Sequence, residues 1–181
     1  LADEAHKAIR QEVDRDQSKY GMGTTLVTAR FTDNAQINFT HVGDSRLYHF
    51  SLNDRILDQF TVDHSVVQEL YDGGKITKDE MKTHQLRNIL TISLGFEEMF
   101  TRGKIKEYTI NCSAGEAYLL CSDGLLVLDD EAIRNVMNET YAAHPDNDLA
   151  VAQALVTAAN AAGGPDNITV VLARVARVSL E

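Results

Sequence analysis

The chain has 181 residues and a formal net charge of −10, from 27 acidic and 17 basic residues. Hydrophobic residues make up 44% of it, which is ordinary for a globular protein, and the length favours one domain, residues 1–181, around a single core. The acidic balance and the lack of a basic cluster argue against a nucleic-acid surface. No apolar stretch approaches the length of a membrane span, so neither nucleic acid nor a membrane is expected as a partner.

The two cysteines, Cys112 and Cys121, fall in strand-like runs and do not have the spacing of a metal-binding pair. Reduced thiols in the core are therefore predicted, which agrees with a cytoplasmic location. The chain shows no signal peptide and begins with Leu1 rather than Met, so we expect a processed or cut start.

Apolar residues recur at helical spacing near the start of the chain, which predicts an amphipathic helix over about residues 2–16. Beyond a polar loop, short runs rich in Val, Thr, Ile and Phe alternate with turn pairs such as Asp33-Asn34 and Asn53-Asp54. These runs predict an antiparallel meander of four strands. The expected strands cover residues 24–31, 35–42, 46–50 and 55–60.

The pattern becomes helical over about residues 63–104. Ser65 with Gln68, and Thr77 with Glu80, have the spacing of capping boxes, so each pair is expected to begin a helix. The segment is interpreted as a helical insert between two sets of strands.

Strands are expected again over residues 105–112 and 117–121. Two helices should follow, one capped by Asp129 or Asp130 and one after Asn147, before a last strand over residues 167–175. The order strands, helices, strands, helices, strand favours an α+β fold over an alternating parallel one.

Three aspartates stand at the ends of predicted strands, each beside a Gly or Pro turn element. Asp123 follows the apolar run 117–121, which is expected to be buried on both faces, while Asp44 follows an alternating run and Asp166 precedes a β-branched one. Carboxylates brought together repel unless a cation offsets them, and oxygen ligands favour a hard ion such as Mg²⁺ or Mn²⁺. For any one of these motifs, an aspartate that only caps its own turn is the alternative interpretation.

Six motifs occur in the order found in the PP2C-type (PPM) metal-dependent serine/threonine protein phosphatases, and the chain most resembles their compact bacterial members. The resemblance runs from Gly21 to Val175. Its motifs are Gly21-Met22-Gly23-Thr24-Thr25-Leu26, Val42-Gly43-Asp44-Ser45-Arg46, Leu57 to Ser65, Arg87-Asn88-Ile89-Leu90-Thr91, Cys121-Ser122-Asp123-Gly124-Leu125 and Gly164-Pro165-Asp166-Asn167-Ile168-Thr169.

The resemblance implies two antiparallel sheets packed face to face with helices outside. It also implies hydrolysis of phosphoserine and phosphothreonine on a phosphorylated protein substrate, by a water that two Mn²⁺ or Mg²⁺ ions activate. Asp123 and Asp166 match the family's metal aspartates. Asp44 matches the aspartate that serves a third, weaker metal site in bacterial members.

The insert at 63–104 matches the family's flap, a segment beside the active site that is associated with substrate selection. His84 and Arg87 fall in the flap's His-Pro-x-Arg-Asn pattern, with Gln85 in place of the Pro. The resemblance therefore assigns these two residues to the substrate side of the site.

The family's opening section has no match in this chain. That section carries an Arg for the substrate phosphate and an Asp-Gly-Met-Gly-Gly segment whose aspartate bridges both metals. Gly21-Met22-Gly23 shares three residue types with that segment but belongs to a later part of the family pattern. A domain truncated at its N-terminus is therefore expected. Val127 also stands where many relatives carry a further aspartate. The alternative function is a non-catalytic phosphatase-like module that binds or regulates a phosphoprotein partner.

Three further residues are given structural roles. His41 alternates with Ile37 and Phe39, which predicts a core histidine. Arg46 is expected to form an ion pair on a neighbouring strand rather than to contact phosphate, and His64 to lie at a helix start without chemistry.

Overall fold

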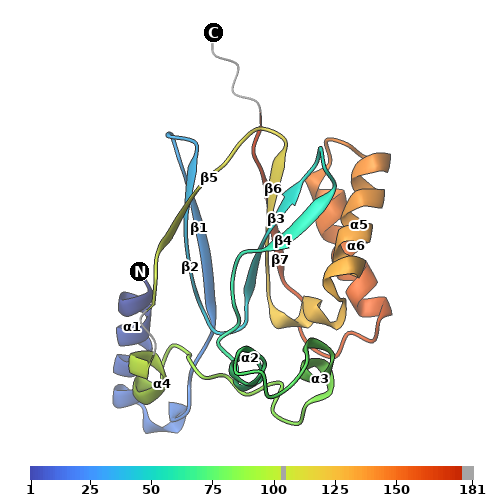
Figure 1. Ribbon diagram of the computed structural model, residues 1–181. Helices are drawn as coiled ribbons and strands as arrows, with labels where there is room; N and C mark the ends of the chain where they lie inside the picture. Colours follow the sequence, from blue (N-terminus) through green and yellow to red (C-terminus); the bar gives the residue numbers. More distant parts are fainter. Residues whose placement is uncertain (103–104, 177–181) are drawn as a thin grey trace. The chain divides into compact units, whose positions relative to one another are not determined.

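The structure is a computed structural model that describes residues 1–102 and 105–176. The expected α+β class is confirmed, with two antiparallel sheets ordered β1-β2-β5 and β4-β3-β6-β7 (Figure 1). The strands are β1 (Leu26–Thr32), β2 (Gln36–Val42), β3 (Arg46–Ser51), β4 (Ile56–Gln59), β5 (Tyr108–Asn111), β6 (Glu116–Cys121) and β7 (Val170–Arg174). The helices are α1 (Ala2–Arg15), α2 (Val66–Asp72), α3 (Lys78–Thr83), α4 (Glu97–Arg102), α5 (Asp130–Ala143) and α6 (Asp148–Ala161), with 3₁₀ turns η1 (Gln17–Lys19) and η2 (Asp123–Val127).

The described chain forms two compact units. Unit 1 draws on residues 1–29, 39–45 and 62–108, and unit 2 on residues 30–38, 46–61 and 109 onward. The three-stranded sheet has residues in both units, and the four-stranded sheet lies in unit 2. The face-to-face packing of the sheets and the single domain over 1–181 stay predictions.

Strand β6 is the central element of unit 2. It pairs antiparallel with β3 on one side, where Cys121 opposes Arg46, and with β7 on the other, where Cys121 opposes Val170. Tyr118 and Leu119, which face opposite sides of the sheet, are both buried. The expectation of a strand buried on both faces is therefore confirmed at the strand's centre.

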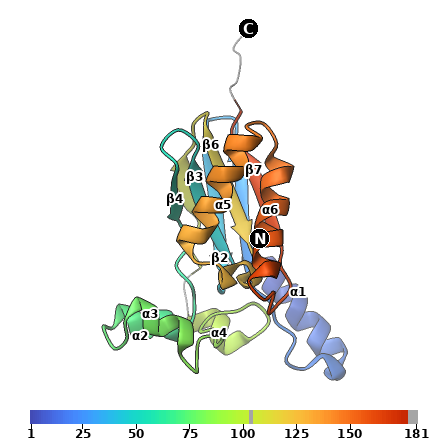
Figure 2. The same cartoon turned by 90° about the vertical axis from the view of Figure 1, so that its right-hand side faces the viewer.

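Helices α5 and α6 run along one face of the four-stranded sheet (Figure 2). Each presents one buried stripe at helical spacing, so the sheet face and the helices share a core. That core contains Tyr48, Phe50, Ala117, Leu119, Cys121, Leu125, Ile133, Met137, Tyr141, Val151, Leu155 and Ala159. Cys112 and Cys121 are free thiols, as expected, and both are buried.

The N-terminus of α5 is capped by Asp129, whose side chain accepts a hydrogen bond of 2.9 Å from Ala132 N. Asp129→Ala is expected to lower the free energy of unfolding by about 1 kcal/mol, because it leaves a helix N–H group without its partner. Urea denaturation would measure this loss. Glu139→Ala, at an exposed position on the same helix, is the control and should change the stability less.

Unit 1 contains the expected helical insert. Ser65 and Thr77 begin α2 and α3 as predicted, and Thr77 forms the reciprocal capping box with Glu80. Helix α4 was not predicted, because two turns are too short to show a helical period. It is held against α1 by His6, whose ring stacks on Phe100 at 3.9 Å and lies 3.0 Å from a Glu97 carboxylate oxygen. The end of the insert, residues 103–104, lies outside the described residues.

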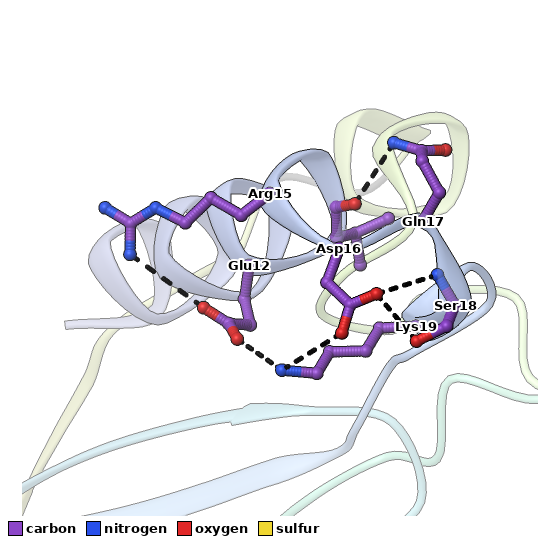
Figure 3. A network of polar contacts seen from close by, with 7 residues as sticks. Glu12, Arg15, Asp16, Gln17, Ser18 and Lys19 are labelled. Atoms are coloured by element: carbon purple, nitrogen blue, oxygen red, sulfur yellow. Dashed lines mark hydrogen bonds and ion pairs between the residues drawn. The ribbon is translucent and has the colours of Figure 1, made fainter.

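The end of α1 is organised by polar contacts (Figure 3). Asp16 accepts hydrogen bonds from Ser18 N at 3.0 Å and from Ser18 Oγ at 2.6 Å, and so begins η1 directly after the helix. Lys19 reaches back to the Glu12 carboxylate, and this contact lowers the pKa of Glu12. The helix therefore ends where the sequence analysis expected the polar loop.

Candidate metal centre

Asp123 lies where β6 leaves the sheet and η2 begins. Its carboxylate is exposed and, within the described part of the chain, has no hydrogen-bond or ion-pair partner. The Asp123 side chain does not cap its own turn, because η2 has Ser122 as its N-cap residue and shows no side-chain cap bond. The alternative of a simple turn cap therefore does not account for Asp123.

The corner that carries Asp166 is joined to the Asp123 corner inside unit 2. Ser122 N donates to Thr169 O at 3.0 Å, Thr169 N donates to Ser122 Oγ at 3.0 Å, and Ser122 Oγ donates to Asn167 O at 3.2 Å. These bonds bring the residue before Asp123 against the residue after Asp166. The two aspartates, 43 positions apart in the sequence, therefore stand on adjoining turns.

Gly124 allows this close approach. A methyl group on Gly124 would lie 2.9 Å from the carbonyl carbon of Asn167 and closer still to its oxygen. Each of the three aspartates stands beside a Gly or Pro turn element, and at Gly124 the physical reason is space for a neighbouring backbone rather than a positive φ. Asn167 thus helps to position the Asp123 corner through its main chain.

The donor chemistry of this corner fits a hard divalent cation. Asp166 uses one carboxylate oxygen, Oδ1, to accept a hydrogen bond of 2.7 Å from Asn167 N, and its side chain is exposed. Asp123 offers both of its oxygens. Exposed carboxylates on fixed turns suit Mg²⁺ or Mn²⁺. Among residues 1–102 and 105–176, however, no group of three or more His, Cys, Asp and Glu is arranged to hold a metal.

A partly buried network lies near the same corner. Arg46 Nη1 donates to the Tyr48 hydroxyl at 2.8 Å, and that hydroxyl donates to Asp130 Oδ1 at 3.1 Å. Burial raises the pKa of Tyr48, so its proton stays in place. Arg46 also lies 3.8 Å from Asp130, so the predicted ion pair exists, although its partner is on α5 rather than on a neighbouring strand. The network ties β3 to the start of α5, just beyond η2.

Asp44 belongs to unit 1, at the turn between β2 and β3. The preceding Gly43 has φ +94°, and a methyl group there would lie 2.8 Å from Thr25 Cβ. Ser45 Oγ lies 2.8 Å from Thr25 Oγ1, so the turn is anchored on both sides of Asp44. The role of Asp44 in metal binding stays a prediction.

His64 holds this turn to the start of the helical insert. Its side-chain Nδ1 accepts a hydrogen bond of 3.2 Å from Gly43 N. Its backbone N–H donates to Gly43 O at 2.9 Å. Its carbonyl accepts from Thr91 N at 2.9 Å. Sequence reasoning missed this role, because no periodic signal marks a histidine that connects two loops.

The His64 contacts predict a specific pH dependence. Burial, and then the neighbouring His41, lower the pKa of His64 from 6.5 to about 4. The unfolded chain therefore binds this proton more readily, and stability should fall as the pH drops from about 6.5 towards 4. NMR titration of the imidazole measures the His64 pKa directly, and urea unfolding at each pH measures the stability. A His64 ring that protonates near pH 6.5 would contradict the assignment.

The substrate-side residues lie in the loop after α3. His84 is the C-cap residue of α3; its Nδ1 accepts from Leu86 N at 3.1 Å, and its carbonyl accepts from Arg87 N at 3.1 Å. The Arg87 side chain is exposed. His84 is therefore engaged with its own loop, while Arg87 is available to solvent.

The chain was compared with known proteins by sequence and by structure. No family model matched the chain. The chain is 37% identical to the serine/threonine protein phosphatase PstP of Mycobacterium tuberculosis over 171 residues, which are 94% of this chain and 31% of that protein. It is 35% identical to the serine/threonine phosphatase stp of Listeria monocytogenes, over 93% of this chain and 63% of that protein. The chain thus spans less than two thirds of these relatives.

Solved structures of serine/threonine phosphatases also resemble this chain. The crystal structure of PstP from M. tuberculosis has a TM-score of 0.82 and 35% identity, covering 95% of this chain and 68% of that one. The PPM Ser-Thr phosphatase MsPP of Mycobacterium smegmatis has a TM-score of 0.70 and 34% identity, covering 92% and 69%. The chain belongs to the PPM family of serine/threonine phosphatases. Within this PPM chain, Asp123 and Asp166 are on adjoining corners of unit 2, while Asp44, His84 and Arg87 belong to unit 1.

Proposed function

We propose that the protein removes phosphate from phosphoserine and phosphothreonine on phosphorylated proteins. Its relatives at 34–37% identity are named serine/threonine phosphatases or protein phosphatases. The observation that carries the proposal is the pair of joined corners that presents the exposed carboxylates of Asp123 and Asp166. In the sequence, both positions resemble the family's metal aspartates, and their role as metal ligands is part of the proposal.

The proposal includes two divalent cations, Mn²⁺ or Mg²⁺, and a third, weaker site at Asp44. One crystal structure of PstP is a complex with two manganese ions. Asp123 and Asp166 would hold such ions in unit 2, with Ser122 and Asn167 fixing the two turns. Such ions, held by Asp123 and Asp166, would supply the Lewis acidity that activates a water for attack on the phosphate. The chain's own residues supply negative charge and orientation for this chemistry.

Substrate selection is assigned to the flap, residues 63–104. In it, Arg87 presents an exposed guanidinium in a loop that His84 stabilises through Leu86 N. A guanidinium suits a phosphate or an acidic side chain of the substrate. A cytoplasmic location is part of the proposal and rests on the two reduced, buried thiols. Among the described helices, none has the length and apolar character that crossing a bilayer requires.

The test is phosphate release from phosphothreonine, phosphoserine and phosphotyrosine peptides by the full-length protein. We expect release from the first two with Mn²⁺ or Mg²⁺, and its loss after treatment with a chelator. Phosphotyrosine release that persists in the chelator would contradict the proposal. Binding of a phosphopeptide without any turnover would instead identify a non-catalytic module.

A further inference from the structure

Strand β3 contacts the chain on both sides of the Asp123 turn. Before the turn, the backbone of Arg46 pairs with Cys121, the last residue of β6 and two positions ahead of Asp123. After the turn, the side chains of Arg46 and Tyr48 reach Asp130, the first residue of α5. The 3₁₀ turn η2 is therefore held at both of its ends by the same strand.

The side-chain contacts after the turn have a defined order of donors. Arg46 Nη1 donates to the Tyr48 hydroxyl at 2.8 Å, and this hydroxyl donates to Asp130 Oδ1 at 3.1 Å. A guanidinium can only donate, so the hydroxyl uses its own proton for the carboxylate. Tyr48 is fully buried and the Arg46 side chain is 19% exposed. The contacts therefore fix the start of α5 relative to β3.

The chain between Asp123 and Asp130 is short and hydrogen-bonded. Leu125 N donates to Ser122 O at 3.2 Å, and Leu128 N donates to Leu125 O at 3.1 Å, so η2 consists of successive tight turns. Leu125 is also fully buried in the core of unit 2. A displacement of the start of α5 would therefore move these turns, and Asp123 with them, because no loose loop lies between to absorb it.

The Asp123 carboxylate depends on this backbone for its position. Among the described residues, no group donates to its oxygens or pairs with it. We propose that Arg46 and Tyr48 are positioning residues of the metal centre. Through Asp130 they fix the far end of η2, and so place the Asp123 carboxylate for Mn²⁺. This inference rests on the proposed function, because it requires that Asp123 bind a metal ion.

A second tyrosine of unit 2 provides a matched control. Tyr141 is buried, and its hydroxyl donates to Asp148 Oδ1, at the first residue of α6, at 3.0 Å. Asp148 pairs with Arg174, which stands opposite the start of β6, whereas Asp123 follows the end of that strand. Both Tyr48 and Tyr141 thus bond a carboxylate at the start of a helix, but at opposite ends of β6.

The experiment compares Tyr48→Phe with Tyr141→Phe in the full-length protein. Each variant loses one hydroxyl and its bond to a carboxylate, so both should lower the urea midpoint to a similar extent. Calorimetric Mn²⁺ titration should separate them. We expect the Mn²⁺ affinity to fall roughly tenfold in Tyr48→Phe, the low end for a residue that supports a metal ligand, and to stay within about twofold of the parent in Tyr141→Phe.

Hydrogen exchange of the chelator-treated protein supplies a readout that involves no metal. The amides of Leu125 and Leu128 form the η2 bonds, and they should exchange faster in Tyr48→Phe than in Tyr141→Phe. Asp130 provides a second test outside the core, since its side chain is 41% exposed. Asp130→Asn keeps an oxygen that can accept from the tyrosine hydroxyl, so it should retain more Mn²⁺ affinity than Asp130→Ala.

Equal Mn²⁺ affinity in the two tyrosine variants, or equal exchange of their η2 amides, would overturn the inference. So would equal affinity in Asp130→Asn and Asp130→Ala. Asp123→Asn tests the metal centre itself. If Asp123→Asn binds Mn²⁺ as tightly as the parent protein, the proposed metal centre fails and this inference fails with it. If it binds weakly while Tyr48→Phe and Tyr141→Phe bind alike, only this inference fails.

Discussion

Replacing Asp123 with asparagine is expected to lower metal-dependent phosphate release by about 100-fold or more, with the fold unchanged. The carboxylate is exposed and has no partner among the described residues, so its removal should change stability by no more than about 0.5 kcal/mol. Asparagine keeps the size of the side chain and removes one negative charge from the proposed metal shell. Loss of an outer-shell partner of a metal already costs about 10–100-fold, so loss of a direct ligand should cost at least as much.

The measurement is turnover of a phosphothreonine peptide over a range of Mn²⁺ concentrations, together with thermal melting of each variant. Glu139→Gln removes the same charge from another exposed position in unit 2 and should behave as the parent protein does. If Asp123→Asn kept near-normal turnover with Mn²⁺, Asp123 would not belong to the mechanism.

Replacing Gly124 with alanine should damage both stability and metal binding. The added methyl group would lie within 2.9 Å of the Asn167 carbonyl carbon and 3.3 Å of Ile168 Cγ1. The first neighbour is main chain and cannot rotate away, so the two corners must separate. Overpacking of this kind costs about 1–3 kcal/mol. Because the Asp123 and Asp166 turns would move apart, we expect weaker Mn²⁺ affinity in addition to the lower stability.

Urea denaturation and calorimetric Mn²⁺ titration test the two parts separately. Gly73→Ala is the matched control, since Gly73 also has a negative φ and its nearest neighbour, Glu69 O, is 3.2 Å from the added methyl group. A Gly124→Ala variant as stable as Gly73→Ala, with unchanged Mn²⁺ affinity, would show that the close approach does not position the site.

The sequence was enough to identify the elements whose signals are local. Three such signals are found again in the structure, and each depends only on neighbouring residues. They are the helical period of α1, the capping residues Ser65 and Thr77, and the apolar run of β6. The last strand is shorter than predicted, starting at Val170 rather than residue 167, because Asn167 and Thr169 bond to Ser122 instead of continuing the ladder. Helix α4 was not predicted, because its six residues are too few to show a helical period, and it contacts α1 through the His6 and Phe100 rings.

For the candidate site too, some features follow from the sequence and others only from the tertiary structure. The sequence alone indicated that Asp44 and Asp123 follow strands, and the order of its motifs indicated the family that the comparisons confirm. Only the tertiary structure decided that the Asp123 and Asp166 turns adjoin, that Gly124 is needed for space, and that His64 connects two loops. The physical reason is that these relations are hydrogen bonds and steric contacts between segments more than 20 residues apart, and residue type and local spacing carry no information about which distant segment will supply the partner.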